Sequence, residues 1–139
     1  MKFEVTDLKK SFPLMMEYVN RQSPEKNLYL LRGNLGAGKT TFVKHFVAYS
    51  GGNIDEVDSP TFSLVNTYVV NGKTIHHFDL YRLESTDEIE DIGFMEYIDS
   101  GDTCFIEWPE KIADFLPSER VTNIDIALSL NECREYTFS

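Results

Sequence analysis

Residues 33–40 (GNLGAGKT) fit the phosphate-binding pattern G-x-x-x-x-G-K-[ST], which constrains the fold of this chain more strongly than any other feature. Glycines in such a loop allow the backbone to curl until successive N–H groups point at phosphate oxygens. Lys39 can reach the β- and γ-phosphates, and the Thr40 hydroxyl can ligate Mg²⁺. The expected nucleotide contacts are Gly33, Asn34, Leu35, Gly36, Ala37, Gly38, Lys39, Thr40 and Thr41.

The segments on either side of this loop have the character that the motif requires. Residues 27–32 (NLYLLR) form a short apolar run typical of a buried strand, and residues 40–50 place apolar side chains at helical spacing. Gly51 and Gly52 then favour the end of that helix. A helix that begins at the loop adds free N–H groups and a positive dipole end to the phosphate site. This context predicts that the loop binds a nucleoside triphosphate with magnesium.

The rest of the chain predicts a mixed sheet with helices packed on it. Asn71-Gly72 separates two β-rich runs, 62–70 and 73–80, and Asn-Gly is the strongest short signal for a hairpin. We therefore expect an α/β fold, a single P-loop NTPase domain over residues 1–139 whose mixed parallel/antiparallel sheet is flanked by helices. The other expected elements are helices over 7–20, 86–92 and 109–115 and strands over 102–107, 121–130 and 133–138.

Length and charge narrow the functional classes. The chain has 139 residues, which suits one domain, and no apolar run approaches the roughly 20 residues needed to span a bilayer. Its start (MKFEVTDLKKSF) lacks the apolar core of a signal peptide, so we expect a cytoplasmic protein without a membrane partner. The net charge of −10 repels phosphate backbones, and nucleic acid is expected only through a more basic partner. Cys104 and Cys133 are expected as buried thiols rather than a disulfide.

Magnesium at a phosphate-binding loop needs a second anchor, an acid at the carboxyl end of a neighbouring strand. Glu107 ends the apolar run 103–106, and Asp79 follows the β-rich run 75–78. We favour Glu107 for the metal, directly or through a water. Asp79 is expected to orient the attacking water or to support the metal's ligands.

Three aromatic or imidazole side chains beside these acids leave alternatives open. His76 and His77 precede Asp79, and strand alternation favours one facing the core and the other facing solvent over a metal cluster. Trp108 follows Glu107 and can pack either near the nucleotide or in the ordinary core.

Two motifs that the sequence lacks help to distinguish an ATPase from a small-molecule kinase and from a GTP-binding protein. A small-molecule kinase typically uses several arginines on a lid to clamp the transferring phosphates, and no such cluster follows the loop. The guanine-reading Asn-Lys-x-Asp signature is also missing, which disfavours GTP. The two missing features therefore favour ATP hydrolysis over GTP binding or phosphoryl transfer to a small molecule.

Four stretches of the chain together resemble one known family. They are residues 33–41 (GNLGAGKTT), 59–65 (SPTFSLV), 77–83 (HFDLYRL) and 106–110 (IEWPE). In this order and spacing the chain resembles the TsaE family, formerly the YjeE family, which comprises the small P-loop ATPases of bacterial tRNA threonylcarbamoyladenosine (t6A) biosynthesis. The resemblance spans nearly the whole chain and is weakest before Leu28 and after Pro117.

The resemblance implies a role for each candidate residue. Lys39, Asp79 and Glu107 would form the catalytic set, and Thr40 and Glu107 would ligate Mg²⁺. Arg134 would lie near the nucleotide base. Two further residues, Ser59 and Thr61, would belong to a switch-like loop near the γ-phosphate.

The resemblance also implies partners. Family members bind ATP, hydrolyse it slowly alone, and join the transferase subunit TsaD and its inert paralogue TsaB. The ATPase is expected to reset that complex between turnovers rather than catalyse the transfer, and to meet tRNA only indirectly. Two alternatives stay open, a small-molecule kinase of the P-loop class and a nucleotide-dependent binding module that uses ATP only to set the conformation of residues 59–63.

Overall fold

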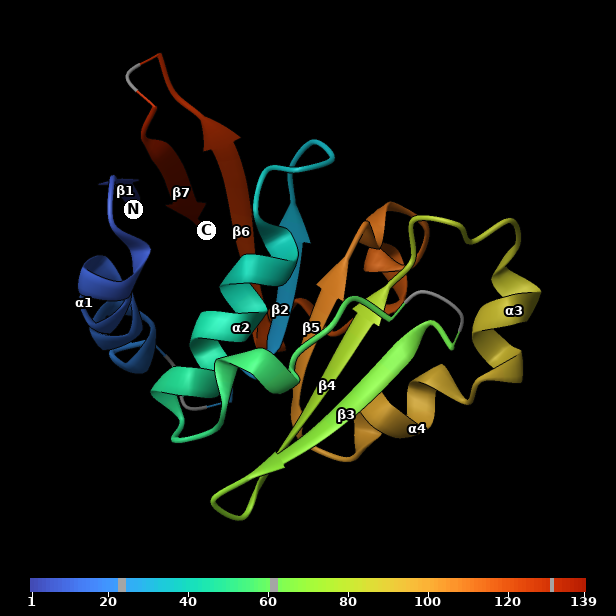
Figure 1. Cartoon of the computed structure of the whole chain (residues 1–139). Coiled ribbons are helices and arrows are strands. Elements are labelled where there is room, and N and C mark those ends of the chain that lie inside the picture. The colour runs from blue at the N-terminus through green and yellow to red at the C-terminus, as the bar shows by residue number, and fades with distance from the viewer. Residues whose placement is uncertain (23–24, 61–62, 131) are drawn as a thin grey trace.

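The structure is a computed structural model that describes residues 1–22, 25–60, 63–130 and 132–139. Among these residues, seven strands form one sheet in the order β1-β7-β6-β2-β5-β4-β3 (Figure 1). The strands are β1 (Lys2–Val5), β2 (Leu28–Arg32), β3 (Val65–Val70), β4 (Lys73–Asp79), β5 (Thr103–Glu107), β6 (Val121–Leu128) and β7 (Arg134–Phe138).

The four central strands, β6, β2, β5 and β4, run parallel to one another. β7 pairs antiparallel with β6, β3 pairs antiparallel with β4, and β1 pairs antiparallel with β7. The expected mixed sheet is therefore confirmed. Carboxyl ends of parallel strands meet at one edge, where ligands bind in open α/β sheets. At this edge β2 ends at Arg32, β5 at Glu107 and β4 at Asp79, so the glycine loop lies beside both candidate acids.

Helices cover both faces of the sheet. The helices α1 (Leu8–Asn20) and α2 (Lys39–Tyr49) pack on one face, and α3 (Thr86–Asp91) and α4 (Phe94–Asp99) pack on the other (Figure 1). The described short 3₁₀ turns are η1 (Ile54–Glu56), η2 (Pro109–Lys111), η3 (Ala113–Phe115) and η4 (Ser118–Arg120).

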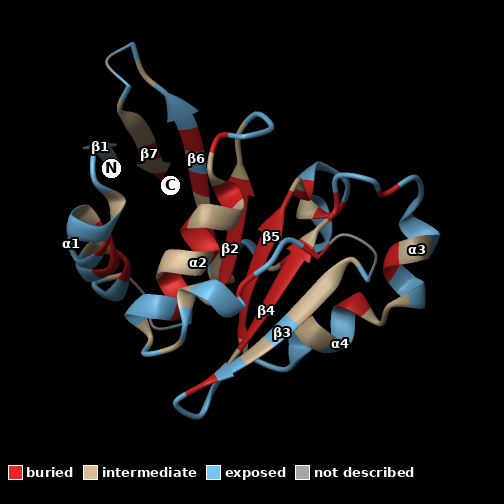
Figure 2. Cartoon of the chain, in the orientation of Figure 1, coloured by how far each residue is buried: buried red, intermediate tan, exposed pale blue. Residues whose placement is uncertain are grey.

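The central strands are apolar because both of their faces are covered. Every residue of β5 is buried, and so is β2 except at its last residue (Figure 2). On the α2 face, Tyr29 stacks on Phe105 with 4.9 Å between ring centroids. On the α4 face, Phe78 meets Phe94 edge-on at 5.1 Å. These two cores fix the positions of the strand ends that carry the polar residues.

The structure differs from the expected elements at four places. Neither β1 nor α4 was expected, because each is too short to show a clear hydrophobic period. The expected helix over 109–115 is two 3₁₀ turns, η2 and η3, since Ile112 between them has φ −124° and ψ −5°, outside helical geometry. The start of the expected strand over 62–70 lies outside the described residues, and β3 begins at Val65.

Two further expectations concern the state of the two cysteines and the presence of membrane-spanning helices. Cys104 and Cys133 are not joined in a disulfide. Cys104 is buried as expected, whereas Cys133 is only half-buried and lies just before β7. Within the residues described, no helix combines the length and the apolar character that crossing a membrane requires.

Candidate functional site

The glycine loop joins the end of β2 to the first turn of α2. Gly38 precedes α2 with a φ of +108°, a left-handed conformation in which any side chain is strained. A Cβ on Gly33 would lie 2.6 Å from the Ile126 carbonyl oxygen, so only glycine allows the loop to lie this close to β6. The loop thus ends at a helix start, where unpaired N–H groups and the helix dipole favour an anion.

Lys39 is the first residue of α2 and is almost fully buried, with 4% of its surface exposed. Its Nζ donates hydrogen bonds to the carbonyl oxygens of Gly33 at 2.5 Å and Asn34 at 3.0 Å. The same ammonium lies 4.1 Å from the centroid of the Trp108 ring, a cation–π contact. Burial lowers the pKa of Lys39, and the negative charge of nearby acids, above all Glu107, opposes that shift.

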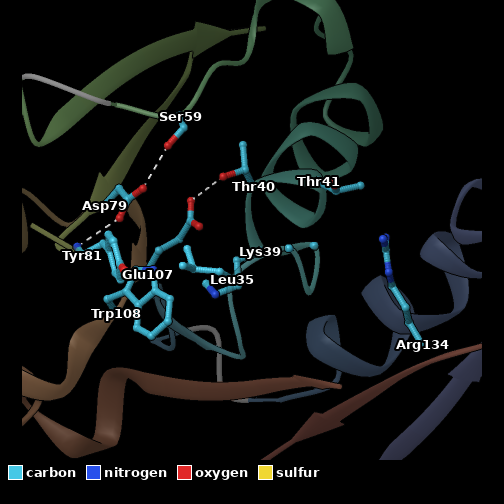
Figure 3. A pocket seen from close by; sticks show the side chains of 12 residues that line it. Leu35, Lys39, Thr40, Thr41, Ser59, Asp79, Tyr81, Glu107, Trp108 and Arg134 are labelled. Atoms are coloured by element: carbon cyan, nitrogen blue, oxygen red, sulfur yellow. Dashed lines mark hydrogen bonds between the residues drawn. The ribbon is translucent and has the colours of Figure 1, made fainter. Parts of the chain in front are cut away.

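Thr40 and Glu107 are joined across the edge of the sheet. Thr40 Oγ1 donates a hydrogen bond of 2.8 Å to Glu107 Oε2 (Figure 3). Glu107 is 3% exposed and also accepts a hydrogen bond from the buried imidazole of His77 at the same Oε2. A hydroxyl oxygen and a carboxylate are therefore already in contact at the end of the glycine loop.

Asp79 lies beside Glu107, because the parallel register of β4 and β5 pairs these two residues. Ser59 Oγ donates a hydrogen bond of 2.9 Å to Asp79 Oδ2, and the Tyr81 backbone N–H donates one of 3.1 Å to Oδ1 (Figure 3). The backbone just after β4 thus orients the Asp79 carboxylate, and Ser59 links it to the segment that precedes β3.

These groups surround one cavity of about 280 Å³ at the start of α2 (Figure 3). Asp79 and Ser59 lie at one end of it and Arg134 at the other, with Lys39 and Thr40 between them. The described lining residues are Leu35, Gly36, Gly38, Lys39, Thr40, Thr41, Ser59, Asp79, Tyr81, Glu107, Trp108 and Arg134.

Most residues that the sequence singled out line this cavity. Gly33, Asn34 and Ala37 line a neighbouring cavity of about 410 Å³ between the loop and β6. Arg134, the first residue of β7, approaches the glycine loop, and a Cβ on Gly38 would lie 2.9 Å from its Nη1. Thr61 lies outside the described residues.

Two residues reach the site that the sequence reasoning did not place there. Tyr81 packs on Trp108 with 5.0 Å between ring centroids, and Trp108 both lines the cavity and packs against the core on the α4 face. His77 contacts Glu107, whereas alternation led us to expect one of the two histidines in solvent. That expectation is wrong, because both faces of β4 are covered: His76 and His77 are 6% and 0% exposed.

The donor set fits a magnesium nucleotide. Mg²⁺ prefers hard oxygen ligands and usually takes only one or two from protein, the rest coming from waters and phosphates. Thr40 Oγ1 and the Glu107 carboxylate supply such oxygens at the helix start. The described residues contain no cluster of three or more His, Cys, Asp or Glu that could hold a metal by itself. The arrangement therefore suits a metal that arrives with phosphate oxygens.

The sequence matches one family model, described as "Threonylcarbamoyl adenosine biosynthesis protein TsaE", over residues 7–136. Curated relatives named "tRNA threonylcarbamoyladenosine biosynthesis protein TsaE" include that of Haemophilus influenzae, 44% identical over 96 residues, which are 68% of this chain and 60% of the relative. The relative from Treponema pallidum is 40% identical over 120 residues, which are 86% of each chain.

The alignments cover only part of several relatives, and one solved structure has a similar fold. The aligned part spans 60%, 51% and 63% of the relatives from Haemophilus influenzae, Rickettsia conorii and Rickettsia bellii, so the chain matches about half to two-thirds of their length. Among solved structures, the crystal structure of YdiB from Bacillus subtilis superposes with a TM-score of 0.70 at 28% identity. That match covers 99% of this chain and 83% of the other.

Proposed function

Since this chain belongs to the TsaE family of threonylcarbamoyl adenosine biosynthesis proteins, we propose that it binds and hydrolyses ATP as an accessory protein of t6A formation at tRNA adenosine 37. The observation that carries the proposal is the coincidence of the family match over residues 7–136 with a glycine loop and two acids around one cavity. In this proposal, residues 1–139 act as one weak ATPase domain in the cytoplasm.

The glycine loop is the proposed triphosphate cradle. The start of α2 offers N–H donors, and Lys39 would exchange its bonds to two loop carbonyls for charge-assisted bonds to the β- and γ-phosphates. Thr40 and Glu107 would hold Mg²⁺, directly or through a water. When bound, Mg²⁺ supplies positive charge that offsets the charge developing on the phosphates.

Asp79 is the proposed group for the attacking water. It lies next to Glu107 at the end of the cavity opposite Arg134 and is held by two hydrogen bonds. A carboxylate in this position can accept a proton or orient a water for attack on the terminal phosphate. Its bond to Ser59 would couple hydrolysis to the switch-like segment that contains Ser59 and Thr61.

Arg134 is proposed to contact the nucleoside end of ATP. It lines the cavity on the side away from Asp79, close to Gly38. A guanidinium can stack on a base or donate to a nearby phosphate oxygen. Thr41 lines the same side and would reach the α-phosphate.

The charge of the chain supports action through partners. With a net charge of −10, contact with tRNA would be indirect, through a complex that contains homologues of TsaD and TsaB. In that complex, ATP hydrolysis would reset the assembly between turnovers, while the transfer of threonylcarbamoyl takes place on the partner.

The other functions have less support. A small-molecule kinase would need several basic clamps, and the described cavity wall holds only Lys39 and Arg134. A nucleotide-dependent binding module would need no group to orient a water, yet Asp79 is held in place beside the cavity by Ser59 and Tyr81. A product assay with labelled ATP separates these cases, since only the ATPase releases free phosphate to water.

The decisive experiment measures ATP hydrolysis by this chain alone and with its TsaD and TsaB homologues, together with t6A in cells that lack the chain. We expect hydrolysis to rise when the partners are added, and t6A to be restored by the wild type but not by Lys39→Ala or Asp79→Ala. Hydrolysis that stays unchanged with both partners would contradict the accessory role. Restoration of t6A by both variants would contradict the need for ATP.

A further inference from the structure

His77 lies directly behind the proposed magnesium site. Its side chain has no exposed surface, and its Nε2 is hydrogen-bonded to Glu107 Oε2. The same Oε2 accepts the hydrogen bond from Thr40 Oγ1 at 2.8 Å. Because a carboxylate only accepts hydrogen bonds, the imidazole carries its proton on Nε2 and is the donor in this pair.

The register of the sheet places the imidazole where it can act on Glu107. In the parallel pairing of β4 and β5, His77 lies opposite Phe105 and Asp79 lies opposite Glu107. Residues two apart in a strand share a face, so His77, Asp79 and Glu107 all project toward the face that α2 covers. Strand β4 therefore carries both Asp79, the proposed water-orienting acid, and His77, which donates a hydrogen bond to the proposed metal ligand Glu107.

A simple packing role accounts poorly for an imidazole at this position. Within the described residues, His77 Nδ1 is buried and has no hydrogen-bond partner. A buried nitrogen that has lost its water without gaining a partner lowers stability, and an apolar side chain of similar size would avoid that cost. Among the described residues, the imidazole forms its polar contact with Glu107, so the benefit that offsets the cost lies at that carboxylate.

We propose that His77 is a positioning residue that fixes the Glu107 carboxylate in the orientation required to bind the magnesium of the nucleotide. With Oε2 held by two donors, the Glu107 side chain cannot rotate without breaking both hydrogen bonds, and the second carboxylate oxygen is kept available for the metal or for a water bound to it. This inference rests on the proposed function, since it assumes that Thr40 and Glu107 bind magnesium.

The test measures magnesium affinity directly and does not depend on turnover. Trp108 is the one tryptophan in the chain and contacts Lys39 at the cavity wall, so its fluorescence reports on the site. Each protein is saturated with ADP and titrated with Mg²⁺, and its ADP affinity is also measured in EDTA. Circular dichroism and thermal unfolding identify the variants that are folded.

The variants separate positioning from packing. His77→Leu removes the donor, and His77→Gln keeps an N–H donor at similar reach. His76→Leu is the matched control, because His76 is also buried in β4 but faces the opposite side of the sheet, where it bonds to Asp102 at 2.9 Å. If His77→Leu does not fold, His77→Asn, whose amide is too short to reach Glu107, takes its place.

We expect His77→Leu to weaken Mg²⁺ binding about 10- to 100-fold while ADP affinity in EDTA stays unchanged. His77→Gln should remain within a few-fold of wild type, and His76→Leu should match wild type. Unchanged Mg²⁺ affinity in His77→Leu or His77→Asn, an equal loss in His76→Leu, or no recovery in His77→Gln would each overturn the proposal. Failure of the wild type to bind ADP, or to bind it more tightly with Mg²⁺, would instead overturn the proposed function and this inference with it.

Discussion

The hydroxyl of Thr40 donates a hydrogen bond of 2.8 Å to Glu107 Oε2, across a separation of 67 positions in the chain. The bond joins the first turn of α2 to the carboxyl end of β5, two elements that meet because β5 pairs in parallel with the strand that leads into the glycine loop. It directs the hydroxyl hydrogen toward the carboxylate and so leaves the lone pairs of the hydroxyl for a cation. The two proposed metal-binding side chains are thus brought together by the fold itself.

Glu107→Gln removes one negative charge from this pair with little change in shape. We expect Mg²⁺ to lose its effect on nucleotide binding, so that ATP affinity at saturating Mg²⁺ falls about 10- to 100-fold, the value of a charge-assisted contact. Affinity in EDTA should be unchanged, and calorimetric titration measures both. Glu110→Gln is the control, because Glu110 is an exposed acid of η2 that also influences Lys39. If Mg²⁺ still strengthens ATP binding by Glu107→Gln, Glu107 is not the metal ligand.

Lys39→Ala tests the phosphate loop itself. The ammonium is held at the base of the loop by two carbonyl oxygens and Trp108, a position from which it can transfer to phosphate oxygens. Losing a charge-assisted contact costs roughly 1.5–3 kcal/mol, so ATP binding should weaken about 10- to 100-fold with or without Mg²⁺. Lys44→Ala, a change on the same helix, should bind ATP as the wild type does. Equal affinities for Lys39→Ala and wild type would refute the loop assignment.

The glycine loop and its neighbours could be predicted because their signals are local. The motif demands a strand before it and a helix after it, and the observed β2 (Leu28–Arg32) and α2 (Lys39–Tyr49) lie within one residue of the expected bounds. The hairpin between β3 and β4 was equally local, since Asn71 and Gly72 both have positive φ, as a type I′ turn requires. In each case a few adjacent residues determine the backbone.

The rest of the site depends on contacts between distant segments. Alternation along β4 correctly predicts that His76 and His77 lie on opposite faces of the sheet. The sequence does not show that α4 covers one face and α2 the other, and this cover buries both histidines. Likewise β1 forms because β7 pairs with it, and α4 forms because Phe94 packs on Phe78. No local pattern contains that information.

Gly38→Ala separates backbone strain from crowding at the nucleotide loop. The residue has φ +108°, and a Cβ would lie 2.9 Å from Arg134 Nη1. We expect a loss of about 1–3 kcal/mol in the free energy of unfolding, measured with urea, and weaker ATP binding. Gly101→Ala is the matched control, because φ is +81° there and nothing lies within 4 Å of the added carbon. It should lose stability yet keep ATP affinity. Normal ATP binding by Gly38→Ala would contradict a close fit between loop, Arg134 and nucleotide.

Asp79→Asn distinguishes hydrolysis from binding. The amide keeps the size of the side chain and an oxygen that can accept from Ser59 or Tyr81, but it cannot take up a proton or orient a water as strongly. We expect kcat for ATP hydrolysis, measured with the partner proteins present, to fall about 100-fold or more, while ATP affinity changes less than about threefold. Asp58→Asn, an exposed acid near the same segment, should hydrolyse ATP normally. If Asp79→Asn hydrolyses ATP as fast as the wild type, Asp79 does not take part in hydrolysis.

Cys104 predicts how stability responds to alkaline pH. Burial, aided by the negative charge of Asp102, raises the pKa of this thiol from 9.0 to about 12. Above pH 9 the unfolded chain therefore releases a proton that the folded chain retains, and the free energy of unfolding falls by up to about 1.4 kcal/mol per pH unit for this group. Cys104→Val lacks the proton, so its stability relative to wild type should be constant below pH 9 and improve steadily from pH 9 to 10.5 in urea unfolding. Ile106→Val in the same strand, which removes only a methylene, should differ from wild type by the same amount at every pH. A constant difference for Cys104→Val as well would mean that the thiol ionises as easily in the folded chain as in the unfolded one.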